Sequence, residues 1–241
     1  MTGRLWGVGI GPGDPELITF KAARVIAAAQ VVAYHAGPDK PSIARQIAAA
    51  HVRADQIELP LIYPMTVGPS PDGRSYDRVL GDFYAAAERA LGAHLEAGRD
   101  VAVLCEGDPM LFGSYMHLHV RLARRHPTEV VPGVTSPLAA AAALGAPIAF
   151  RDEAVAILPG TMSENELTRR LADSDAAVIM KLGRQFPKAV RALTRAGLID
   201  RALYVERASM ANQRILPIAE VDPAEVPYFA IILVPSARPH P

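Results

Sequence analysis

The chain has 241 residues, of which 50% are hydrophobic, and its 25 basic side chains balance 25 acidic ones. This length suffices for one large α/β domain or two small ones. A net charge of zero argues against nucleic acid or an anionic membrane as the main partner. The single cysteine, Cys105, excludes an intramolecular disulfide framework and a thiolate-rich metal centre. The sequence contains neither a membrane-spanning apolar run nor a signal peptide, so we expect a soluble cytoplasmic protein.

Apolar runs of strand length alternate with helical patterns along the first half of the chain. Strands are predicted at residues 5–10, 31–34, 101–105 and 130–131, and helices at 15–29, 42–50, 83–97 and 137–144. The run 101–105 is apolar throughout, which is typical of a strand that helices cover on both faces. This alternation of strand and helix predicts a mostly parallel sheet.

The second half of the chain shows the same alternation of strands and helices less regularly. Strands are predicted at 155–158, 176–181, 203–207, 214–218 and 228–234, and helices at 163–171 and 187–196. The last two strands are joined by a short polar connection, which favours an antiparallel pair and therefore a mixed sheet. We predict two α/β domains, at residues 1–136 and 137–241.

Residues 59–76 differ from the rest because they are rich in proline and glycine and have no periodicity. A long irregular segment of this kind is either a lid over a ligand or a mobile insertion. The sequence leaves both interpretations open.

Three predicted strands are followed by a small polar residue and then a proline, at Asp14-Pro15, Asp108-Pro109 and Ser136-Pro137. Each pair is a typical helix start, because the polar side chain caps the helix and proline suits its first turn. Helices that begin at the carboxyl edge of a parallel sheet border the crevice where ligands bind. We therefore expect a binding crevice at this edge.

The first of these turns contains four glycines within residues 7–13. A dinucleotide fingerprint would need a further glycine where Pro12 or Asp14 stands, so a nicotinamide cofactor is not expected. The glycines instead predict that a ligand or a neighbouring chain approaches the backbone closely.

Other chemical signals are weak. His117 and His119 would point about 200° apart on a helix and have no nearby Cys or Asp partner, so we predict no metal site. Lys181, Arg184 and Arg207 lie at the ends of predicted strands, where they would contact either an anionic ligand or solvent.

Together these segments resemble the tetrapyrrole methylase family over nearly the whole chain, from Leu5 to Val234. The resemblance is carried by GVGIGPGDPELIT at the start, CEGDP, VVPGVTS, VIMKLGR and YVERAS. Within the family, CEGDPMLFGSYMHLH, LPGTMSENEL and YVERASMANQRILP are most similar to the precorrin-2 C-20 methyltransferases. The resemblance implies two α/β domains with S-adenosylmethionine in the cleft between them, a homodimer, and methylation of a meso carbon during cobalamin biosynthesis.

The resemblance also implies roles for individual residues. The cofactor-binding residues would be Glu106, Gly107, Asp108, Leu111, Thr135, Ser136, Met180 and Ala208. The glycine-rich opening would face the substrate. Asp14 beside it is our candidate to orient the macrocycle or accept its proton, or it only caps a helix. The carboxylates of a tetrapyrrole need basic partners, for which we nominate Arg184, Lys181 and Arg151.

Three alternatives share part of this pattern. A sibling enzyme that acts at another ring position, or on the cobalt-containing substrate, would carry the same cofactor motifs. A relative that methylates ribosomal RNA would need a basic groove, against which the neutral charge argues. A tetrapyrrole carrier without catalytic activity would not need the cofactor motifs.

Overall fold

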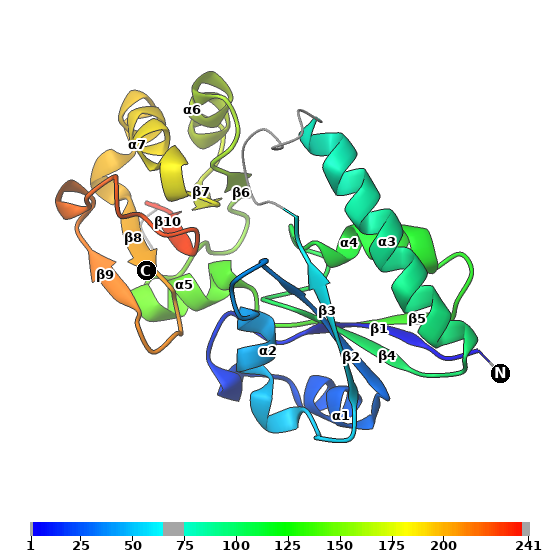
Figure 1. The fold of residues 1–241 in the computed structure, drawn as a ribbon. Coiled ribbons are helices and arrows are strands. Elements are labelled where there is room, and N and C mark those ends of the chain that lie inside the picture. The colour runs from blue at the N-terminus through cyan, green and yellow to red at the C-terminus, as the bar shows by residue number, and fades with distance from the viewer. Residues whose placement is uncertain (1, 65–74, 238–241) are drawn as a thin grey trace. The chain divides into compact units, whose positions relative to one another are not determined.

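Two α/β units make up the structure, a computed structural model that describes residues 2–64 and 75–237 (Figure 1). The first unit is Met1–Thr135 and the second is Ser136–Pro241. The division lies one residue before the predicted boundary between residues 136 and 137. Each unit has its own sheet and hydrophobic cores, as the predicted fold class requires.

The sheet of the first unit is entirely parallel, with strand order β3-β2-β4-β1-β5. Its strands are β1 (Leu5–Gly9), β2 (Val31–Ala36), β3 (Ile57–Ile62), β4 (Val101–Cys105) and β5 (Thr128–Val131). Its helices are α1 (Phe20–Ala28), α2 (Ile43–Ile47), α3 (Tyr76–Glu96) and α4 (Tyr115–Leu122). One core joins the sheet to α1 and α2, and another joins its opposite face to α3 and α4. Every residue of β4 is buried, as expected for a strand between two helical layers.

The sheet of the second unit is mixed, with strand order β6-β7-β10-β8-β9. Its strands are β6 (Val155–Pro159), β7 (Ala176–Met180), β8 (Leu203–Glu206), β9 (Arg214–Leu216) and β10 (Ala230–Val234). Its helices are α5 (Ser136–Leu144), α6 (Glu164–Ala172) and α7 (Phe186–Arg195). Helices α6 and α7 contribute to the core on one face of the sheet, and α5 contributes to the core on the other.

The pairing of the last two strands differs from the prediction. β9 pairs antiparallel with β8, whereas β10 lies between β7 and β8 and is antiparallel to both. The reason is burial, because all five residues of β10 are buried. A strand in the centre of the sheet has both of its faces covered by the cores on either side. β6, β7 and β8 consequently run in the same direction and end at the same edge.

The predicted irregular segment 59–76 is partly regular. Its first residues complete β3, an edge strand in which Pro60 is tolerated because one side of the strand needs no hydrogen bond. Its last residues begin α3, where the Ser75 hydroxyl accepts a hydrogen bond from the Arg78 backbone N–H. The predicted lid otherwise falls on residues 65–74, which lie outside the described residues.

Two of the three predicted helix starts also differ. Asp14 caps only the 3-10 turn Pro15–Leu17, and α1 begins at Phe20 behind a second cap, Thr19. Asp108 caps a turn rather than a helix, and the next helix, α4, begins at Tyr115. Only Ser136-Pro137 opens a helix directly, which is α5. Among the described residues, no helix is long and apolar enough to cross a membrane.

Candidate functional site

The loops that follow β1, β4 and β5 meet at the carboxyl edge of the first sheet. The Ile10 backbone N–H donates to the Cys105 carbonyl at 3.0 Å, and the Gly107 N–H donates to the Gly11 carbonyl at 2.7 Å. The first bond continues the parallel β1–β4 pairing and the second belongs to an antiparallel bridge, so the glycine-rich opening is bonded to the loop after β4.

Glycine at two positions lets these loops touch. A Cβ atom on Gly133 would lie 2.1 Å from the Gly107 carbonyl oxygen, and one on Gly9 would lie 2.5 Å from the Gly133 nitrogen. Neither distance is sterically allowed. The close approach that the glycines predicted is therefore made at Gly9 by neighbouring loops of this chain.

Asp108 joins two of the loops through its side chain. Oδ1 accepts the Met110 backbone N–H at 2.8 Å, and Oδ2 accepts the Gly133 N–H at 3.0 Å. The preceding residue, Gly107, has φ of +66°, which favours glycine. A carboxylate that accepts two backbone N–H groups forms charge-assisted bonds that fix the turn after β4 against the turn after β5.

The other predicted residues of the first unit have different positions and partners. The Glu106 carboxylate accepts the Ala44 N–H at 3.1 Å, and desolvation raises its pKa although the residue as a whole is exposed. Leu111 closes the turn with an N–H bond to the Asp108 carbonyl, and Thr135 ends the unit. Asp14 accepts the Glu16 N–H at 2.9 Å, so its capping role is realised.

The second unit has a corresponding edge where β6, β7 and β8 end. The Gly160 N–H after β6 donates to the Met180 carbonyl at the end of β7. Met180 packs against the same core as Ala208, which follows β8 and is 6% exposed. That core includes residues of α5, the helix that Ser136 opens. Met180 and Ala208 thus share one core, and Ser136 begins the helix that packs on it.

The three nominated basic residues do not lie together. Lys181 directly follows β7, and Arg184 lies in the 3-10 turn Gly183–Gln185, so both are at the edge where β7 ends. Arg151 precedes β6 and therefore lies at the opposite edge. A substrate at the Met180 edge would contact Lys181 and Arg184 before it contacted Arg151.

Glu206, at the end of β8, was not singled out from the sequence. It is 3% exposed and accepts hydrogen bonds from the Tyr204 hydroxyl at 2.9 Å and from Arg207 Nη1 at 3.1 Å. Arg214 Nη1 lies 3.6 Å from the same carboxylate. The sequence signal that could have indicated Glu206 is an acidic residue at the end of an otherwise apolar strand.

An aromatic group lies on the α3 and α4 side of the first sheet. The His35 ring at the end of β2 is 5.9 Å from the Tyr63 ring and 6.0 Å from the Phe83 ring. Tyr63 and Tyr84 share a hydroxyl hydrogen bond of 2.8 Å. His35 Nε2 is buried and has no hydrogen-bond partner among the described residues. Because burial disfavours the imidazolium, the pKa of His35 is lowered to about 4.

We expect His35 to make the first unit sensitive to acid. A histidine whose folded pKa lies below its unfolded value near 6.5 stabilises the fold fully above that value. The contribution is lost as the pH falls toward 4, to a limit of about 3 kcal/mol. Urea unfolding followed by fluorescence of Trp6, the only tryptophan, should therefore give a free energy of unfolding that drops between pH 7 and pH 5. His35→Phe should flatten that drop, and an equal drop in the variant would contradict this assignment.

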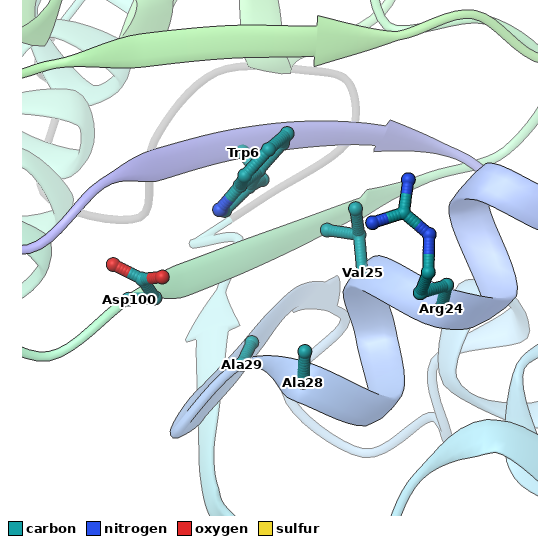
Figure 2. A pocket seen from close by; sticks show the side chains of 6 residues that line it. All are labelled: Trp6, Arg24, Val25, Ala28, Ala29 and Asp100. Carbon is teal, nitrogen blue, oxygen red and sulfur yellow. The ribbon is translucent and has the colours of Figure 1, made fainter.

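A shallow pocket on the α1 side of the first sheet is separate from these loops. Figure 2 shows its lining residues, which are Trp6, Arg24, Val25, Ala28, Ala29 and Asp100. Asp100 precedes β4, so the pocket reaches toward the amino end of that strand rather than its carboxyl end.

No group of three metal-ligating side chains occurs within residues 2–64 and 75–237. The two histidines that the sequence placed close together have different partners. The His117 ring lies 4.5 Å from the Tyr84 ring, whereas His119 Nδ1 is 3.3 Å from the Tyr115 hydroxyl.

Comparison with known proteins gives a consistent picture. Residues 4–222 match the family described as Tetrapyrrole (Corrin/Porphyrin) Methylases. The chain is 53% identical over 236 residues to the cobalamin biosynthesis protein CobIJ of Mycobacterium tuberculosis, but it spans only 46% of that protein. It is 49% identical to precorrin-2 C(20)-methyltransferase of Sinorhizobium sp, covering 99% of this chain and 98% of that enzyme. It is 33% identical to cobalt-precorrin-2 C(20)-methyltransferase of Salmonella typhimurium, with 97% of each chain covered.

A solved structure is also similar. Uroporphyrin-III C-methyl transferase from Thermus thermophilus, complexed with S-adenyl homocysteine, superposes with a TM-score of 0.68 and 28% identity. The match covers 97% of this chain and 92% of that one, so both α/β units are shared.

Proposed function

The chain belongs to the tetrapyrrole (corrin/porphyrin) methylases, and from this membership we propose that it transfers a methyl group from S-adenosylmethionine to C-20 of precorrin-2. The product would be precorrin-3A, an intermediate of cobalamin biosynthesis. The observation that carries this proposal is the 49% sequence identity, over nearly the full length of both chains, with the Sinorhizobium precorrin-2 C(20)-methyltransferase. The identity to the enzyme named for cobalt-precorrin-2 is lower, which favours the metal-free substrate.

The residues present suit S-adenosylmethionine. In the first unit, the carboxylate of Glu106 and the fixed turn at Asp108 offer negative charge to a ligand that carries a sulfonium and an ammonium. In the second unit, Met180 and the small side chain of Ala208 offer an apolar surface for an adenine ring. We propose that both sets of residues bind this cofactor.

Bound S-adenosylmethionine supplies an electrophilic methyl group, so the protein needs no nucleophile of its own. Its own residues must hold the electron-rich meso carbon in line with that methyl and exclude water, which accounts for ~7–11 kcal/mol of a barrier in well-oriented reactions. Lys181 and Arg184 would bind substrate carboxylates. Asp14, beside the glycine-rich opening, would orient the macrocycle or accept the proton that leaves C-20.

The test is incubation of the chain with S-adenosylmethionine and precorrin-2, with and without cobalt, followed by product mass and the position of the new methyl. We expect the mass of one added methyl group, located at C-20, from the metal-free substrate. Transfer only with cobalt would identify the cobalt-precorrin enzyme, and a methyl at another carbon would identify a sibling. Binding of the tetrapyrrole without transfer would identify a carrier and overturn the proposal.

We also propose a homodimer, which the family resemblance implies, and a cytoplasmic location. Sedimentation velocity would test the assembly, with the mass of two chains as the expected result.

A further inference from the structure

The loop at residues 207–213 connects β8 to β9 and contains Ala208, one of the proposed cofactor-binding residues. Two of its non-glycine residues have a left-handed backbone, Arg207 with φ of +50° and Ser209 with φ of +69°. This conformation costs free energy for residues with a Cβ, and it persists only where surrounding contacts enforce it. The contacts that enforce this conformation therefore help to determine the position of Ala208 within the loop.

Glu206 contacts both ends of this loop. Its carboxylate accepts a hydrogen bond from Arg207, the first residue of the loop, and lies 3.6 Å from Arg214, the residue that follows the loop. Glu206 and Arg214 are register partners in the β8–β9 pairing, which brings the two loop ends together. The Tyr204 hydroxyl, from the same strand, donates a third contact that holds the carboxylate in place.

The interior of the loop is closed by its own bonds. The Ser209 N–H donates to the Gln213 side-chain carbonyl at 2.8 Å, and the Met210 N–H donates to the Arg207 carbonyl at 2.9 Å. Ala208 is thereby kept packed against the core that includes α5 and Met180. The buried carboxylate of Glu206 has three partners at the base of this loop. Removing its charge would leave Arg207 and Arg214 without their shared partner, so the carboxylate fixes the geometry of the loop.

We propose that Glu206 is a positioning residue that holds the loop 207–213 in its cofactor-binding conformation. The inference rests on the proposed function, because it assumes that Ala208 contacts S-adenosylmethionine. Glu206 itself acts through Arg207 and Arg214, and it is not proposed to touch the ligand.

The decisive variant is Glu206→Gln, which preserves shape and an acceptor for Tyr204 but removes the charge. Its matched control is Glu164→Gln on α6, because Glu164 also pairs with two arginines of the second unit, Arg191 at 2.8 Å and Arg195 at 3.2 Å. We expect the Kd for S-adenosylmethionine, measured by calorimetry on the full chain, to rise about tenfold in Glu206→Gln. The control should stay within about twofold of wild type.

Two further readouts separate positioning from general destabilisation. Hydrogen exchange of the amides at 208–213 should become faster in Glu206→Gln and stay unchanged in Glu164→Gln. Arg214→Gln should weaken binding in the same direction, and the double variant with Glu206→Gln should lose less than the sum of both. Arg214 is exposed, so this variant tests the inference even if Glu206→Gln does not fold.

The outcomes are distinct. Unchanged affinity and exchange in Glu206→Gln, or equal losses in Glu164→Gln, would overturn the positioning role while leaving the proposed function intact. No binding of S-adenosylmethionine by the wild-type chain would overturn the proposed function and this inference with it.

Discussion

Replacing Asp108 by alanine should lower the affinity for S-adenosylmethionine about 100-fold or more. The carboxylate joins the loops after β4 and β5, because Oδ2 accepts the N–H of Gly133 while Oδ1 accepts the N–H of Met110 within its own loop. Each hydrogen bond to a charged group is worth ~1.5–3 kcal/mol, so the loss of two destabilises the turn that we propose binds the cofactor by more than the ~2.7 kcal/mol of a 100-fold change. Calorimetric titration of the folded variant measures the effect.

Asp14→Ala is the matched control for this variant. Asp14 is also an aspartate that caps a turn after a strand of the first sheet, where its Oδ1 accepts the N–H of a neighbour in sequence, Glu16. Its loss should therefore leave cofactor affinity within about twofold while it lowers turnover, if Asp14 serves the substrate. Wild-type affinity in a folded Asp108→Ala protein would remove the loop after β4 from the binding site.

The alternation of apolar strands and amphipathic helices predicted both sheets, since it depends on local patterns that tertiary structure leaves unchanged. The errors in the predicted elements arose where tertiary structure determines the position of a strand or the start of a helix. Residues 59–62 of β3 belong to the segment predicted as irregular from its prolines, glycines and lack of periodicity, yet an edge strand tolerates Pro60. β10 was paired by loop length, although its five buried residues called for a central position. The beginning of α3 was missed because the turn signals before Ser75 mask the helix that follows.

The candidate site was predictable at the level of loops but not of atoms. The repeated strand–turn–proline pattern located Asp108 and Ser136 at strand ends, as the structure has them. The bond from Gly133 to Asp108 joins residues 25 apart in sequence, and no spacing rule indicates it. Likewise, Arg151 appeared equivalent to Arg184 in the sequence, because only the strand directions distinguish the two edges of the second sheet.

Replacing Arg184 by alanine should reduce kcat/KM for the tetrapyrrole ten- to 100-fold and leave cofactor affinity nearly unchanged. Arg184 is exposed in the 3-10 turn that follows Met180 and Lys181, so its guanidinium is available at the edge where β7 ends. A guanidinium binds a carboxylate through two parallel hydrogen bonds, worth ~1.5–3 kcal/mol for a charged partner. Steady-state kinetics with precorrin-2 and calorimetry with S-adenosylmethionine measure the two quantities separately.

Two companion variants locate the carboxylate contact. Arg184→Lys should also lose activity, though less than alanine, because an ammonium keeps the charge but cannot form the paired bonds. Arg151→Ala should have the smaller effect, since Arg151 precedes β6 at the other edge of the sheet. Full activity of Arg184→Ala would make this arginine a solvated surface charge and move the search to Lys181 and Arg207. A large loss in Arg151→Ala alone would instead mean that the substrate carboxylates lie at the edge where β6 begins.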